Sequence, residues 1–220
     1  MEAKIISLPY ISRLKHTIEL LDLDINRAKE QGSFKQPDKR LWMKTSYGIG
    51  LRSPLNNLWQ FLARLDSRIG SLNILKIFDV GSFLGDTGAL FSRLFKEVSL
   101  IEGDSKMMGI SKKRLKLLQS SGLVDLAKIR FQEGDCLSED VKFKGADIIY
   151  NYCDKCDTDV EHVTPFYTKL TEKIIAEANQ GVFLITLNAS DTSGIQKHMR
   201  NVPSLNKLIG TSEFLVFQRR

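Results

Sequence analysis

Cysteine, proline and histidine are scarce in this chain, and long apolar runs are missing. Of 220 residues, 3 are cysteines, 5 are prolines and 3 are histidines. An odd, small number of cysteines does not make a disulfide framework, and without a signal-like apolar segment it favours a reducing, cytoplasmic setting. No stretch is long and apolar enough to cross a bilayer, so we expect no membrane partner.

Acidic residues are outnumbered by basic ones. The chain has 32 Lys and Arg against 26 Asp and Glu, a formal net charge of +6. This balance permits an acidic or nucleic-acid partner without requiring one. The basic run Lys112, Lys113, Arg114 and Lys116 is typical of a solvated helix face.

Metal ligands are also few. Cys153 and Cys156 form a single C-x-x-C, and His162 is the nearest imidazole. Because a zinc site normally takes four such ligands, we predict a reduced thiol pair and no metal.

The first 70 residues have the pattern of a helical extension. Apolar residues recur at three- and four-residue steps over 10–31, which predicts a helix. A polar connector with several aromatic residues follows over 32–50. Ser53 and Pro54 then supply a helix N-cap and a first-turn proline, and the second predicted helix ends near Gly70.

From residue 71 the pattern alternates between strands and helices. We predict strands over 74–80, 98–102, 127–132, 146–151, 181–187 and 213–218, and helices over 86–95, 105–120, 160–179 and, in an irregular region, 193–200. Such alternation is typical of a doubly wound, mostly parallel α/β sheet. The chain is therefore expected to consist of an extension, 1–70, and an α/β domain, 71–220.

A glycine turn after the first predicted strand is the most informative local feature. Gly81 and Gly85 follow the apolar strand, and Glu102 ends the next one. A strand that runs into such a turn places backbone N–H groups and a helix N-terminus at the carboxyl edge of the sheet. A carboxylate at the tip of the neighbouring strand can hold two ribose hydroxyls. The pattern predicts a nucleoside-cofactor site, although the two glycines alone could also serve a tight turn.

The same residues discriminate between nucleoside cofactors. A dinucleotide site uses G-x-G-x-x-G so that the backbone can approach a pyrophosphate, but Phe83 stands where the second glycine would be. Asp79, just before the turn, adds a negative charge that suits a cation better than a diphosphate; it could instead cap the turn. S-adenosylmethionine carries a sulfonium and an ammonium and no phosphate, so we favour this methyl donor.

Residues 79–85 resemble motif I of the class I S-adenosylmethionine-dependent methyltransferases, with the middle glycine replaced by Phe83. The resemblance implies a Rossmann-like, seven-stranded sheet. It also implies that Glu102 binds the ribose and that residues 133–136 lie beside the adenine, which we expect Asp135 to contact. It implies cofactor contacts from Tyr47, Asp79, Gly81, Ser82, Gly85, Glu102, Asp135, Cys136 and Asn151.

The segment 146–152 resembles the fourth strand of this fold, whose end faces the reacting methyl group. Asn151 and Tyr152 are therefore our candidates for catalysis, as residues that position the methyl acceptor. Base-modifying enzymes often carry N-P-P-Y or D-P-P-Y here to hold a flipped base, but no proline follows Asn151.

Residues 134–140, together with 148–152, are similar to the Dot-type, non-SET protein lysine methyltransferases. Tyr47 and Gly48 resemble the segment that covers their cofactor. This resemblance implies a protein lysine as acceptor, in preference to nucleic acid. An RNA or small-molecule methyltransferase is one alternative. A non-catalytic binding module, with Phe83 filling part of the cofactor site, is another.

Overall fold

A computed structural model describes residues 7–30, 55–151, 160–187, 199–201 and 214–220. Its elements are α1 (Leu8–Glu30), α2 (Leu55–Ile69), η1 (Leu72–Ile74), β1 (Lys76–Val80), α3 (Asp86–Leu94), β2 (Glu97–Glu102), α4 (Ser105–Ser120), η2 (Leu126–Lys128), β3 (Ile129–Glu133), β4 (Ile148–Asn151), α5 (Val160–Glu177), β5 (Phe183–Leu187), β6 (Met199–Asn201) and β7 (Phe214–Arg219). Apart from the region 193–200, each predicted helix and strand begins and ends within two residues of its observed bounds.

The strands form one seven-stranded sheet in the order β3-β2-β1-β4-β5-β7-β6. The pairs β1–β2, β2–β3, β1–β4 and β4–β5 are parallel, whereas β7 runs antiparallel to both β5 and β6. The predicted Rossmann-like, mostly parallel α/β architecture is confirmed. The order reverses between β1 and β4, and sheets of this kind bind ligands at such a switch point, beyond the carboxyl ends of the strands.

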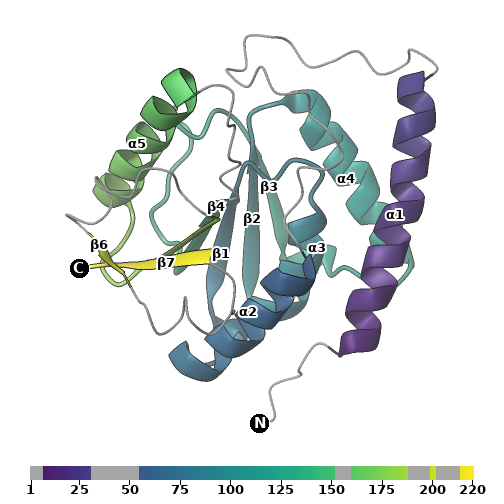
Figure 1. Ribbon diagram of the computed structural model, residues 1–220, viewed down its shortest axis with the longest axis horizontal. Helices are drawn as coiled ribbons and strands as arrows, with labels where there is room; N and C mark the ends of the chain where they lie inside the picture. Colours follow the sequence, from purple (N-terminus) through teal and green to yellow (C-terminus); the bar gives the residue numbers. More distant parts are fainter. Residues whose placement is uncertain (1–6, 31–54, 152–159, 188–198, 202–213) are drawn as a thin grey trace.

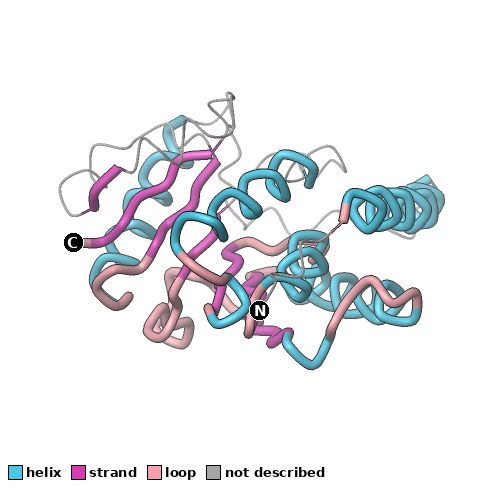
Figure 2. The backbone as a smooth tube through the Cα atoms, turned by 90° about the horizontal axis from the view of Figure 1, so that it is seen from below, coloured by secondary structure: helices cyan, strands magenta, loops and turns pink. Residues whose placement is uncertain are grey.

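Helices cover both faces of the sheet (Figures 1 and 2). One core joins the sheet to Ile11 of α1, Phe61 of α2, Phe91 of α3 and Leu115 of α4. The other core joins the opposite face to Leu170 of α5. This division follows from right-handed crossovers, which place the connecting helices on one face up to the switch point and on the other face beyond it.

The extension packs into the same core as the sheet. Phe61 of α2 stacks on Phe214 of β7, with ring centroids 5.3 Å apart. The hydroxyl of Tyr10 in α1 donates to the carbonyl of Leu123, after α4, at 2.7 Å. The apolar stripes that predicted these helices are thus the faces that they bury in this shared core. The boundary at residues 70 and 71 stays a prediction.

The prediction of a helix over 193–200 is wrong at its end. Met199 and the next two residues form β6, which pairs antiparallel with β7 through Met199 and Arg219. Met199 is buried in the core on the α5 side of the sheet, so tertiary contacts outweigh the weak local preference. Residues 193–198 lie outside the described residues.

No helix within the described ranges has the length and apolarity needed to cross a membrane.

Candidate functional site

The turn between β1 and α3 depends on two glycines that serve different purposes. Gly81 and Gly85 have φ angles of 75° and 77°, which residues with a Cβ adopt only with strain. A Cβ on Gly85 would collide with the Ser111 hydroxyl and contact Leu115 of α4. A Cβ on Gly81 would meet nothing within 4 Å. Gly85 therefore allows close helix packing, whereas Gly81 leaves open space at the carboxyl edge.

Four amide groups of this turn are already engaged. Those of Gly81 and Ser82 both donate to the Ile101 carbonyl, at 2.9 and 3.0 Å. The Phe83 amide donates to Glu102 Oε2 at 2.8 Å, and the Gly85 amide to the Ser82 carbonyl at 2.8 Å. A pyrophosphate needs several such donors turned toward it. These four amides are not turned toward a pyrophosphate, in agreement with the interpretation against a dinucleotide.

Asp79 lies at the end of β1, buried, and accepts a hydrogen bond from the Thr87 hydroxyl of α3. Burial raises the pKa of its carboxyl from 3.8 to about 7; the Thr87 bond lowers this pKa and the charge of Glu102 raises it. Within the described residues no ion pair joins Asp79 to a basic side chain. A buried carboxylate in these surroundings is costly unless a cation approaches it.

Glu102 ends β2 and links the turn to the next helix. Its carboxylate accepts from the amide of Phe83 and, at 3.0 Å, from that of Asp104. Burial raises its pKa, while hydrogen bonds from the backbone amides of Asp104, Phe83 and Gly103 lower it. Asp104 in turn caps α4, accepting from Lys106 and Met107. Because a carboxylate has about four acceptor positions, Glu102 retains capacity for a further donor such as a hydroxyl.

Phe83 occupies the position of the missing glycine in the left-handed region, with φ 48°. It is the one residue other than glycine with a positive φ in the described part of the chain. A side chain in this conformation costs on the order of 1–2 kcal/mol. The departure from the glycine pattern is therefore a strained point in the turn.

A buried hydroxyl supports the presence of a ligand at this turn. The Oγ of Ser82 is enclosed and has no hydrogen-bond partner among the described residues. An unpaired buried hydroxyl costs about 1–3 kcal/mol. Together with the open space beside Gly81 and the carboxylate of Asp79, it fits a small cationic cofactor.

The loop after β3 carries two further predicted contacts. The Gly134 amide donates to the Glu102 carbonyl at 3.0 Å, which brings the start of the loop beside the end of β2. Asp135 is exposed and accepts from the Leu137 amide at 2.9 Å. Cys136 is mostly buried, and burial, reinforced by the charge of Asp135, raises the pKa of its thiol to about 12. The thiol is thus protonated at neutral pH and unsuited to act as a nucleophile.

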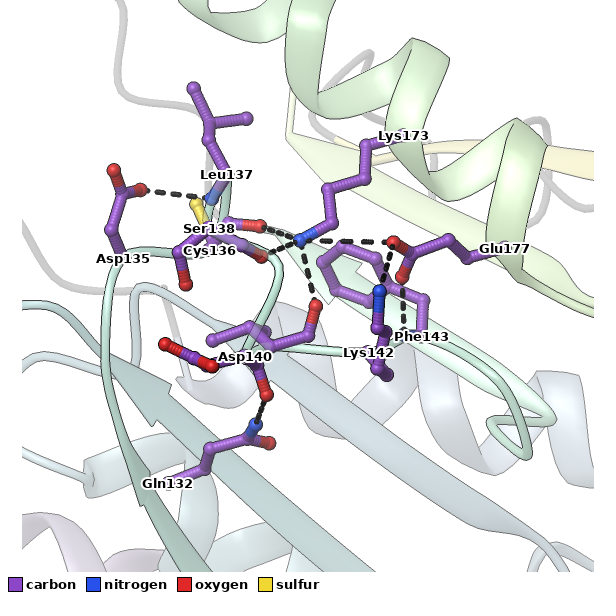
Figure 3. A network of polar contacts seen from close by, with 11 residues as sticks. Gln132, Asp135, Cys136, Leu137, Ser138, Asp140, Lys142, Phe143, Lys173 and Glu177 are labelled. Atoms are coloured by element: carbon purple, nitrogen blue, oxygen red, sulfur yellow. Dashed lines mark hydrogen bonds and ion pairs between the residues drawn. The ribbon is translucent and has the colours of Figure 1, made fainter.

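Lys173 of α5 anchors this loop (Figure 3). Its ammonium contacts the carbonyls of Cys136, Ser138 and Val141. Sequence reasoning missed this residue, because nothing in the local pattern of α5 distinguishes one lysine from another.

Asn151 lies at the switch point, where its side-chain amide donates to the Val80 carbonyl at 3.0 Å. It joins the ends of β4 and β1, and its register neighbour on β5 is Thr186. The buried hydroxyl of Thr186 has no partner within the described ranges. Sequence reasoning overlooked it, although a threonine ending an apolar strand was a usable signal. Tyr47 and Tyr152 lie outside the described residues.

Arg114 contradicts the prediction of a solvated basic face. It is buried and pairs with Asp86 at the start of α3, at 2.9 Å, and with Asp22 of α1, at 3.0 Å. Lys112, Lys113 and Lys116 are exposed, as predicted. The helical period turns Arg114 inward while its neighbours face water. One residue of this basic run therefore has a structural role.

Comparisons with known proteins show the fold. Neither models of protein families nor curated protein sequences match this chain. An RNA methyltransferase from Salinibacter ruber, solved with S-adenosyl-L-homocysteine, is 15% identical, with a TM-score of 0.53 over 76% of this chain and 92% of that chain. TrmN from Thermus thermophilus is 15% identical, with a TM-score of 0.54 over 78% and 50%. A methyltransferase from Geobacter sulfurreducens is 15% identical, with a TM-score of 0.50 over 97% and 91%. At these identities the similarity establishes a common fold.

Proposed function

We propose that this chain is an S-adenosylmethionine-dependent methyltransferase. The observation that carries the proposal is Asp79: a buried carboxylate without a basic partner among the described residues, beside a glycine turn with engaged amides. That environment favours a cationic ligand over a phosphate. The fold similarity to methyltransferases, one of them solved with S-adenosyl-L-homocysteine, supports it.

The described residues around the turn fit such a cofactor. Asp79 would face the methionine ammonium, Glu102 the ribose hydroxyls and Asp135 the adenine. Gly81 and Ser82 would line the space between them, and Gly85 would hold the turn against α4. For Cys136, Asn151 and Tyr47, cofactor contact remains a prediction from the resemblance.

Methyl transfer from this cofactor does not need a strong general base from the protein. The cofactor supplies a methyl group on a good sulfonium leaving group, so the protein mainly aligns the nucleophile and excludes water. An amine acceptor must lose its proton before attack, which a poorly solvated channel favours by lowering the amine pKa. We assign Asn151 and Tyr152 to positioning the acceptor.

For the acceptor, a protein lysine is our first candidate, because residues 134–140 and 148–152 are similar to the Dot-type enzymes. RNA is a second candidate, favoured by the exposed lysines of α4: Lys106, Lys112, Lys113 and Lys116, on a helix without any acidic residue. Labelled donor added to a lysate, followed by separate protease and ribonuclease digestion, distinguishes the two by which digestion releases the label.

Calorimetric titration tests the cofactor. S-adenosylmethionine and S-adenosylhomocysteine should bind at micromolar concentration, and NAD should not. Glu102→Ala should abolish binding, whereas Glu97→Ala, at the opposite end of the same strand, should leave it intact. Folded wild-type protein that binds neither ligand would overturn the proposal and leave a non-catalytic module.

A further inference from the structure

The ammonium of Lys173 is held by three backbone carbonyls of the loop between β3 and β4 (Figure 3). Nζ donates to the carbonyl oxygens of Cys136 at 3.0 Å, Val141 at 2.7 Å and Ser138. The Glu177 carboxylate, one helical turn along α5, lies 3.9 Å away. A single side chain thus ties together both ends of the loop 136–141.

These contacts use the full donor capacity of the side chain. An ammonium has three N–H donors, and each has a backbone acceptor here. The side chain is 13% exposed, and its charge lies 5.5 Å from the centre of the Phe143 ring. Charge-assisted bonds in a poorly solvated place are stronger than neutral ones. Lys173 therefore acts as a cross-link between α5 and the loop.

The cross-linked loop begins at the candidate site. The Gly134 amide is bonded to the carbonyl of Glu102, and Asp135 bonds the Leu137 amide inside the loop. Two of the three carbonyls bound by Lys173 belong to Cys136 and Ser138, which follow Asp135 within three residues. The amide bonded to the Asp135 carboxylate belongs to Leu137, which lies between these two residues.

We propose that Lys173 is a positioning residue for recognition of the cofactor's base. It does not touch the cofactor; it holds the loop so that Asp135 can accept a hydrogen bond from the exocyclic amine of adenine. This inference rests on the proposed function, because it presumes the nucleoside at this edge. Through Lys173, the helix α5, which covers the face of the sheet opposite to α3 and α4, contributes to recognition of the base.

The test compares Lys173→Met with Lys142→Met. Lys142 is a matched control, because its ammonium lies 3.6 Å from the same Glu177 carboxylate but is exposed. Calorimetry would measure S-adenosylhomocysteine and its deaminated analogue S-inosylhomocysteine, which carries a carbonyl in place of the amine. Wild type and Lys142→Met should prefer adenine. Lys173→Met should bind S-adenosylhomocysteine at least about tenfold more weakly, because binding must then order the loop. This variant should also lose the preference for adenine over the deaminated base.

Amide hydrogen exchange without ligand supplies a readout that does not depend on binding. Exchange over residues 136–141 should accelerate in Lys173→Met and not in Lys142→Met. Lys173→Gln, which keeps two N–H donors, should give a smaller effect in both measurements and covers the case in which Lys173→Met folds poorly.

Two results have different meanings. If wild type binds S-adenosylhomocysteine and folded Lys173→Met keeps both its affinity and its preference for adenine, the role of Lys173 is overturned and the proposed function stands. If wild type binds neither nucleoside, the proposed function fails, and the role of Lys173 in base recognition fails with it.

Discussion

At the residue scale, the carboxyl of Asp79 links ligand binding to pH. Burial raises its pKa from 3.8 to about 7 in the folded protein. Because the folded state then binds this proton more tightly than the unfolded state, the group makes the free energy of unfolding fall as pH rises from about 4 to about 7, by at most ~4 kcal/mol. Above pH 7 the contribution is constant.

Asp79→Asn should therefore stabilise the ligand-free protein at pH 8 and have little effect near pH 4. Asparagine keeps the acceptor for Thr87 and removes the buried charge. The same change should weaken S-adenosylmethionine binding at pH 8 by tenfold or more, since a charge-assisted contact is lost. Thermal unfolding and calorimetry at both pH values check this. Equal stability of the two proteins at pH 8 would contradict the raised pKa.

Wild-type affinity for S-adenosylmethionine should rise from pH 6 to pH 8, because the ammonium binds the ionised form of Asp79. S-adenosylhomocysteine, which keeps the ammonium but lacks the sulfonium, should show the same trend. Titrations at constant ionic strength measure it, and Asp79→Asn is the control that should flatten the profile. A profile unchanged by that substitution would assign the pH dependence to another group.

The strain at Phe83 can be separated from the bulk of its ring. Phe83→Ala removes the ring and keeps the Cβ at a φ of 48°, whereas Phe83→Gly also relieves the strain. We expect Phe83→Gly to be more stable than Phe83→Ala by about 1 kcal/mol in urea unfolding. If the ring fills cofactor space, both variants should bind S-adenosylmethionine more tightly than wild type. Equal stability of the two variants would show that the backbone is unstrained.

At the element scale, the β1–α3 turn combines a ligand-facing and a packing function. Gly81→Ala and Gly85→Ala share the penalty of a positive φ, but only the Cβ at Gly85 collides with α4. Gly85→Ala should lose more unfolding free energy, by about 1–3 kcal/mol, the usual cost of overpacking. Gly81→Ala should lose cofactor affinity with a smaller loss of stability. Urea unfolding and calorimetry on both variants measure this difference, which a similar stability loss would contradict.

At the scale of the whole molecule, Arg114 connects the N-terminal extension to the candidate site. It bridges Asp22 of α1 and Asp86, which follows the glycine turn directly. Arg114→Met would leave both carboxylates without the cation they contact, a change that costs about 3–5 kcal/mol for buried pairs. The exposed neighbour Lys113→Met should change stability by less than ~0.5 kcal/mol. Similar urea midpoints for the two variants would show that the bridge carries no stability.

Most helices and strands were predictable because the sequence patterns that indicate them are local. The strands from β1 to β5 and β7, and the helices from α1 to α5, follow from apolar periodicity and turn residues. The short β6 was missed because its partner, β7, supplies its stability. The prediction that Arg114 lies on an exposed helix face was wrong, because a run of like charges does not show which residue points inward.

The sequence alone determined the succession of helices and strands from α1 to β5 and the strand β7, the glycine turn after β1 and the carboxylate that ends β2. These depend on backbone conformation, apolar spacing and residue type within a short window. Only the tertiary structure decided which turn amides are engaged, that Asp79 is buried without a basic partner among the described residues, and that Lys173 and Arg114 hold distant segments. Burial and ion pairing depend on residues far apart in the chain, so composition and spacing do not contain them.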